Sequence, residues 1–230
     1  MRPEVQRRDL LIALLALGLL LAWEASGWER SLTHHFGSAA GFAWRDSWWS
    51  RGVLHDGGHW LGTGVLLLFV MDTARPLLPG PDQRERLFWL GTTLAVALLV
   101  PAFKRVSTTS CPWDLIEFGG TVPYVPHWLL GLSDGGPGHC FPSGHAVTAF
   151  AFFGLYFLWR PHRPVLARRV IACVGLAGVV FGLTQWIRGA HFPSHTFWSA
   201  WLCWTAFVAA AEARQLLSSK PHAPQVQFLS

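Results

Sequence analysis

Charged side chains are scarce in this sequence. Asp, Glu, Lys and Arg together make up 13% of its 230 residues, whereas a soluble domain carries about 25%. Hydrophobic residues account for 51%, and they gather in runs long enough to cross a lipid bilayer. The scarcity of charge therefore excludes an ordinary soluble domain and predicts a polytopic membrane protein.

Three other features are missing. No small-residue cleavage site follows the first apolar run, where Glu24 and Trp28 stand instead, so we expect this run to be kept as a membrane span. No internal repeat divides the chain, which predicts a single membrane-embedded domain over residues 1–230. The basic residues do not cluster, so the net charge of +5 does not indicate a nucleic-acid partner.

Six apolar segments are present, each near the length that a membrane-spanning helix needs. We therefore expect an all-α fold, a bundle of six transmembrane helices. The predicted spans are Leu10–Trp28, His59–Met71 with its flanks, Leu87–Phe103, Gly144–Trp159, Leu166–Ile187 and Ser194–Ala211.

An even number of spans places both termini on one side of the membrane. Most Arg and Lys residues fall on that side, which the positive-inside rule makes cytoplasmic. For a bacterium this predicts the inner membrane, with residues 29–58 and 104–143 as periplasmic loops and 214–230 as a cytoplasmic tail. Trp44, Trp48 and Trp49 predict a short amphipathic helix at the membrane surface over residues 44–49.

Residues that suit phosphate chemistry fall on the predicted outer face. Cys-Phe-Pro-Ser-Gly-His, ending at His145, leads into an apolar run. Ser143 and Gly144 leave N–H groups open at the start of a helix, where an anion is favoured. His145 adds an acid or base that works near neutral pH. Lys104 and the basic run from Arg188 to His195 share this face, so we expect the site there.

With these residues, the chain resembles the type 2 phosphatidic acid phosphatase (PAP2) family, the membrane relatives of vanadium haloperoxidases. That family carries Lys-x6-Arg-Pro, Pro-Ser-Gly-His and Ser-Arg-x5-His-x3-Asp. The middle motif is complete here, and the spacing of the other two is kept around Lys104 and His191. Cys111, Gln185 and His195 stand where the family has Arg, Arg and Asp.

The resemblance implies catalytic roles. His191 would attack phosphorus and form a phosphohistidine that water hydrolyses, while His145 would protonate the leaving oxygen and then help to activate water. His195 would orient His191 in place of the Asp. Asp114 or Glu117 is a candidate for the missing carboxylate.

The resemblance also implies a set of substrate-binding residues. Lys104 and Arg188 would neutralise the phosphoryl oxygens, with Arg188 reaching the anion from one helical turn beyond Gln185. Ser143, Gly144 and Gln185 would add hydrogen bonds to these oxygens.

Four cysteines are present. Cys111 and Cys140 lie beside motif residues on the predicted outer face, where the compartment is oxidising, and we expect a disulfide between them. Cys173 and Cys203 lie within predicted spans and are expected to be packing residues.

A metal pair is the weaker signal in this sequence. His55 and His59 have helical i,i+4 spacing and could bind a metal, but the sequence shows no clear third ligand. The chemistry of the PAP2 family needs no metal, so no cofactor is expected.

The expected activity is therefore hydrolysis of a lipid phosphate or pyrophosphate at the outer leaflet. Candidate substrates implied by the family are phosphatidylglycerol phosphate, phosphatidic acid, isoprenoid pyrophosphates such as undecaprenyl pyrophosphate, and the phosphates of lipid A. Two alternatives remain open: a phosphotransferase that uses the same phosphohistidine, and a non-catalytic lipid-binding membrane protein.

Overall fold

A computed structural model describes residues 3–129 and 131–218 of the chain. Helices dominate the described residues, and the all-α prediction is confirmed. The long helices are α1 (Pro3–Ser26), α3 (Gly57–Ala74), α4 (Gln83–Val106), α7 (Pro164–Ile187) and α8 (Pro193–Ser218). The shorter elements are α2 (Trp28–Thr33), the π-helix η1 (Trp48–Asp56), the 3-10 helices η2 (Pro112–Asp114) and η3 (Ile116–Phe118), α5 (Gly144–Phe150), α6 (Phe153–Trp159), and the antiparallel strands β1 (Gly37–Ser38) and β2 (Gly41–Phe42).

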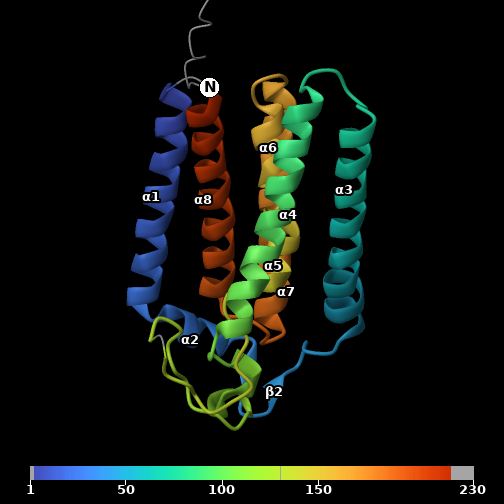
Figure 1. Cartoon of the computed structure of the whole chain (residues 1–230). Coiled ribbons are helices and arrows are strands. Elements are labelled where there is room, and N and C mark those ends of the chain that lie inside the picture. The colour runs from blue at the N-terminus through green and yellow to red at the C-terminus, as the bar shows by residue number, and fades with distance from the viewer. Residues whose placement is uncertain (1–2, 130, 219–230) are drawn as a thin grey trace, which may run out of the picture.

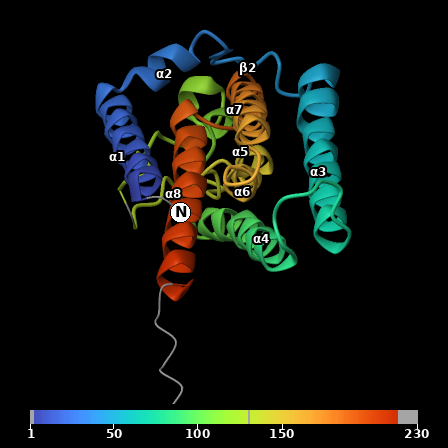
Figure 2. The same ribbon diagram turned by 90° about the horizontal axis from the view of Figure 1, so that it is seen from above.

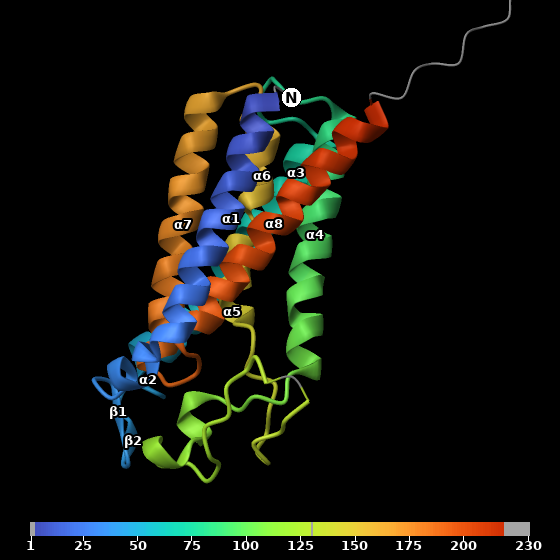
Figure 3. The same cartoon turned by 90° about the vertical axis from the view of Figure 1, so that its left-hand side faces the viewer.

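The long helices lie side by side as a bundle, with α5 and α6 stacked end to end within it (Figure 1). Their common core is aromatic: Trp89 of α4, Phe157 of α6 and Phe207 of α8 are buried against one another. Helix α1 packs along α8 (Figure 3), while α3 stands at the edge of the bundle (Figure 2).

One end of the bundle is covered by α2, the β1–β2 hairpin and residues 107–143, and the N-terminus lies at the other end (Figure 1). Gly27, with φ +65°, ends α1 and redirects the chain into α2. A left-handed backbone of this kind is common at helix C-termini and is adopted by Gly at little cost.

Among the described residues, three helices are long and apolar enough to cross a membrane by themselves: α1 from Glu4, α4 and α7. The count of six spans stays a prediction. The predicted fourth span, Gly144–Trp159, is divided into α5 and α6 by a turn at Ala151 and Phe152.

The short helix predicted over Trp44–Trp49 is wrong. Residues 43–46 form a turn, and η1 begins only at Trp48, because the Ser47 hydroxyl accepts a hydrogen bond from the Ser50 N–H at the helix start. Helix α8 continues to Ser218, so the predicted tail 214–230 is helical in its first residues. Residues 219–230 lie outside the described residues.

Buried ion pairs hold the end of the bundle that is remote from the loops. Arg86 of α4 is fully buried and binds Asp72 of α3, and Arg160 binds Asp9 of α1. Buried charges are tolerated where they are paired in this way. These contacts tie the helices together at the end opposite the loop-covered face.

Candidate active site

Three chain segments meet under the loop-covered end: the last turn of α4, the start of α5, and the turn between α7 and α8. Helix α7 stops because Gly189 takes a left-handed conformation, with φ +72°, and the N–H groups of Ala190 and His191 both bond to the Gln185 carbonyl. This helix ending is the usual glycine C-cap. It turns His191 back towards the bundle.

His191 and His195 face each other in this turn. Their Nδ1 atoms lie 3.3 Å apart, and both side chains are buried. One ring can therefore donate Nδ1–H to the other, as expected for His195 in place of the family's Asp. This arrangement leaves Nε2 of His191 as the nitrogen available for attack.

Burial lowers the pKa of His191 well below its usual value, and the nearby positive charge of Lys104 lowers it further. Both effects disfavour the imidazolium form. His191 is therefore neutral around pH 7, which is the state that a nucleophile requires.

A pH dependence follows from this shift. For the nucleophile that the motifs predict, neutral His191 is the reactive form, so the acid side of the kcat/KM profile should fall only below pH 6.5, the usual pKa of histidine. The substitution Lys104→Met removes the positive charge that lowers the pKa of His191, so this pKa should rise and the acid limb should move to higher pH. Profiles of both proteins on the same substrate check the prediction, since the substrate's own titration is then common to both. An unmoved limb would contradict it.

Lys104 lies in the last turn of α4, beside the start of α5. A methyl group added to Gly144 would lie 3.7 Å from Lys104 Cδ and 4.0 Å from its Nζ. Lys104 is half-buried, with its ammonium at the same cluster that holds His191 and Gly144. Lys104, the predicted cation of the first motif, thus lies beside residues of the second and third motifs.

Polar atoms without partners collect at this cluster. Ser143 Oγ, His145 Nε2 and Gln185 Nε2 are buried, and none has a hydrogen-bond partner among the described residues. Because a buried polar group without a partner costs about 1–3 kcal/mol, several together indicate a place for a polar ligand. The three atoms belong to residues that the sequence predicts for phosphate binding or proton transfer.

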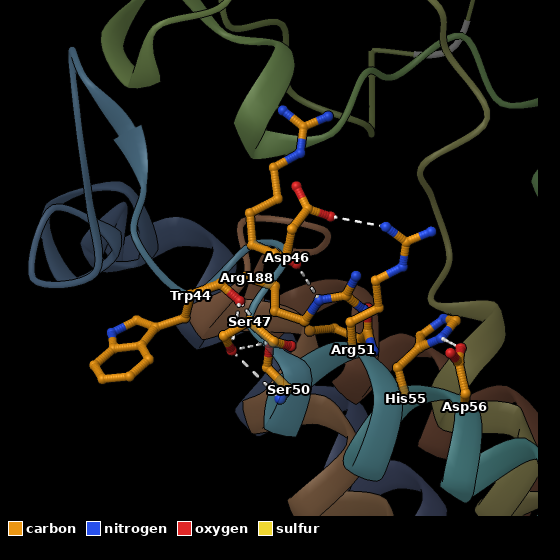
Figure 4. Close-up of polar contacts among 10 residues, drawn as sticks. Trp44, Asp46, Ser47, Ser50, Arg51, His55, Asp56 and Arg188 are labelled. Carbon is orange, nitrogen blue, oxygen red and sulfur yellow. Dashed lines mark hydrogen bonds and ion pairs between the residues drawn. The ribbon is translucent and has the colours of Figure 1, made fainter.

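Arg188 lies next to this cluster and is buried. Its Nε donates to the Arg45 carbonyl at 2.8 Å (Figure 4), and its Nη1 donates to Gln185 Oε1 at 3.4 Å. The charge of Arg188 also acts on His145. A guanidinium thus contacts Gln185, the residue that stands where the family has its second Arg.

The disulfide joins Cys111 to Cys140 across 29 residues, with Cα atoms 5.1 Å apart. Around it, the Cys140 N–H bonds to the Thr109 carbonyl and the Trp113 N–H to the Gly189 carbonyl. The loop after Lys104 is thereby tied both to the segment before His145 and to the turn before His191. Cys140 Sγ, which carries no hydrogen in a disulfide, lies 3.5 Å from His191 Nδ1.

Loss of this bridge should destabilise the protein measurably. In the chain-entropy treatment, a closed loop of this length contributes about 3–4 kcal/mol. We expect the double variant Cys111→Ser, Cys140→Ser to unfold at a clearly lower temperature in detergent, whereas Cys173→Ser should unfold like the parent. An unchanged melting temperature for the double variant would show that the backbone contacts hold the loop by themselves.

Neither candidate for the missing carboxylate reaches His191. Asp114 caps η2, where its Oδ2 accepts a hydrogen bond from the Cys111 N–H at 3.2 Å, and burial raises its pKa. Glu117 forms a two-pronged ion pair with Arg30 at the surface. The hydrogen bond within its own loop gives Asp114 a structural role, and its predicted place at the catalytic centre stays a prediction.

Another carboxylate lies close to the histidines, and the sequence reading missed it. Glu24, from the end of α1, has Oε1 3.0 Å from Nε2 of the buried His127. The His127 ring lies 5.4 Å from the His195 ring, edge to face. The sequence signal was a carboxylate at the end of an apolar span, which is rare enough to suggest a function.

Two groups of possible metal ligands occur among the described residues. One contains Cys140, His191 and His195, but the sulfur of Cys140 is engaged in the disulfide and is not available as a thiolate. The other contains His55, His59 and His145, so the predicted histidine pair lies at the edge of the candidate active site.

Comparison with known proteins gives the family. The fold is similar to a solved transmembrane PAP2-type phosphatidylglycerolphosphate phosphatase from Bacillus subtilis, with a TM-score of 0.56 and 18% identity over 94% of this chain and 98% of that one. No curated protein matches the sequence. This chain is a multi-pass membrane protein, and a family model described as the PAP2 superfamily matches residues 86–217. With more than half of its length matched and the three motif segments assembled in one place, the chain belongs to the PAP2 superfamily.

Proposed function

We propose that this protein is a membrane lipid phosphatase that hydrolyses a phosphate or pyrophosphate ester through a phosphohistidine on His191. One observation carries the proposal: a buried, neutral His191 lies beside the Lys104 cation, and its Nδ1 faces His195. The buried unpartnered atoms of Ser143, His145 and Gln185 support it, because they offer hydrogen bonds to phosphoryl oxygens.

Each step of the reaction has a residue in this arrangement. Nε2 of His191 attacks phosphorus, and the bond between phosphorus and the leaving oxygen breaks. His145, protonated in the presence of the anionic substrate, gives its proton to that oxygen. Water then attacks the phosphohistidine, His145 takes a proton from it, and inorganic phosphate leaves with His191 restored.

An apolar route for the lipid tail is present beside the cluster. A cavity of about 280 Å³ lies between α3, α4 and α5, with His59 and Gly144 in its wall and apolar residues such as Leu66, Ala97 and Val147 lining the rest. A headgroup bound at Gly144 would leave its chains in this cavity. Since α3 stands at the edge of the bundle (Figure 2), a lipid could enter from the bilayer beside it.

We place this site at the periplasmic face of a bacterial inner membrane, with both termini in the cytoplasm. The distribution of Arg and Lys supports this orientation. The start of α1 lies at the end of the bundle opposite the site (Figure 1). A phospholipid, an isoprenoid or lipid A would supply the phosphate.

Glu24 and His127 are proposed as positioning residues in place of the family's Asp. Glu24→Gln keeps the size of the side chain but removes its negative charge, which we expect to act on His191 through His127 and His195. We expect kcat to fall about tenfold, which is about 1.4 kcal/mol of transition-state stabilisation, with little change in KM. Glu24→Asp should recover part of kcat. If KM rises while kcat is kept, the role of Glu24 is structural, through its hydrogen bond to Trp198.

The direct test is release of inorganic phosphate from a panel of lipid phosphates and pyrophosphates by detergent-purified protein, with His191→Ala prepared in parallel. Release by the parent and none by the variant would support the proposal and identify the substrate class. No release from any substrate, together with transfer of labelled phosphate to a lipid acceptor, would replace the hydrolase with a phosphotransferase. Lipid binding without either reaction would overturn the enzyme assignment.

A further inference from the structure

Three histidines from different elements meet at the rim of the candidate active site. His55 ends η1, His59 lies in the first turn of α3, and His145 belongs to α5. One ring nitrogen from each can be chosen so that all lie within 4.8 Å of one another. Because α3 follows η1 without a break, the first two histidines stay on one face, and α5 packs against it.

The separation of two of these rings fits a shared ion. His145 Nδ1 lies 3.3 Å from His59 Nε2. Two imidazole nitrogens that each bind a tetrahedral zinc ion at about 2.0–2.1 Å are about 3.3 Å apart. The same separation permits an N–H···N hydrogen bond, so distance alone does not choose between a proton and a metal.

The third histidine has the outer partner that metal ligands usually have. Its ring stacks on that of His145, with centroids 4.6 Å apart, so binding a shared ion requires the His55 ring to rotate. His55 Nδ1 lies 2.8 Å from Asp56 Oδ1 (Figure 4). A carboxylate that accepts Nδ1–H fixes the tautomer, so that Nε2 carries the free lone pair. Most metal-binding histidines have such an outer partner, which raises the basicity of the ligating nitrogen.

The surrounding charges are mixed. Arg188 and Arg51 lie near Asp56, and the carboxylate of Asp46 lies near Arg188 (Figure 4). Three neutral imidazoles do not cancel the charge of a divalent ion, so its fourth position would favour an anion or a water molecule. A coordination site with three protein ligands and one open position is the arrangement found in catalytic rather than structural zinc sites.

We propose that His55, His59 and His145 form a binding site for one divalent transition-metal ion of the zinc class, with the Asp56 carboxylate supporting His55. The pattern of three imidazoles without a thiolate suits zinc and its neighbours in the first transition row. This inference goes beyond the proposed phosphatase, because it concerns an ion that the family chemistry does not require. Since a metal-bound His145 is no longer free to carry the proton of the proposed reaction, the bound ion would act as an inhibitor of that reaction and not as its cofactor. The test of this inference reads the ion directly and does not depend on turnover.

The experiment uses untagged, detergent-purified protein that is stripped with a chelator, reloaded with zinc chloride and freed of excess metal. Zinc per chain is measured by mass spectrometry, and affinity by competition with a chromogenic chelator. We expect about one ion per chain in the parent. His59→Ala and His145→Ala should each bind at least about tenfold more weakly, and Asp56→Asn about tenfold more weakly.

The matched control is His35→Ala. His35 is exposed and lies outside the cluster, so this variant should bind zinc like the parent. His59→Ala and His145→Ala lie in different helices, so a folding defect in one of them does not prevent the test. Thermal unfolding of each variant in detergent verifies its fold. The proposal is overturned if the parent retains no stoichiometric zinc, or if folded His59→Ala and His145→Ala both bind as the parent does.

Discussion

Exchange of His191 for Ala is expected to lower phosphate release by at least about 10⁴-fold and to leave no phosphate on the protein. Losing the nucleophile of a covalent mechanism removes both half-reactions, and single losses of this kind cost about as much as removing the whole catalytic set. The structure gives the reason for this size. His191 and His195 both combine burial, an Nδ1 partner and the neighbouring charge of Lys104, and His191 is the one that stands at the position of the family's nucleophile.

The measurement is rapid quenching during turnover with a labelled substrate, followed by detection of an acid-labile phosphate on the protein. The parent should carry label on His191, and His191→Ala should carry none. The control is His35→Ala, because His35 is an exposed histidine of the same loop-covered end and lies outside the cluster. Label on the parent at another residue would refute the assignment of the nucleophile.

Exchange of Lys104 for Met is expected to reduce kcat/KM by about 10²–10³-fold, the usual cost of losing one donor to a developing oxyanion. The effect should be large here, because Cys111 and Gln185 stand where the family has arginines. Lys104 and Arg188 are therefore the cations that remain for the phosphoryl oxygens. Met keeps the length and apolar stem of the side chain, so packing against Gly144 is retained.

Arg105→Met is the matched control for this change. Arg105 is the next residue in α4 and is exposed, so it tests whether any basic residue near the membrane surface has the same effect. We expect less than a threefold change in kcat/KM, since exposed charges contribute little. Equal losses in the two variants would indicate a general effect of surface charge on substrate recruitment and would exclude a specific role for Lys104.

The sequence motifs identified most of the residues that meet at the site. The spacing of Lys104, Ser143, His145, His191 and His195 placed all of them on one predicted face, and the structure brings their segments together there. The apolar runs similarly predicted the long helices, with boundaries that differ by several residues. Local patterns predict such features well, because helix length and helix ends depend on neighbouring residues.

The carboxylate near the histidines, Glu24, was the main residue that the sequence patterns did not predict. The sequence suggested Asp114 because it is close along the chain to a motif residue, but the capping demand of its own loop holds it elsewhere. Glu24 is near in space and remote in sequence, since α1 packs along α8. No local pattern could reveal that packing, because it depends on which helix faces match.

By itself, the sequence determined the class of protein and the helices, and it predicted the residues of the phosphate chemistry, because these depend on composition, hydrophobic runs and fixed spacings. Only the tertiary structure decided which side chains from separate segments of the chain become neighbours. It joined His59 and His145 at 3.3 Å, and Glu24 and His127 at 3.0 Å. These pairs arise from the packing of helices on one another and, for His127, of the loop on the helices, and such contacts are spread over the entire chain and leave no mark at any single position.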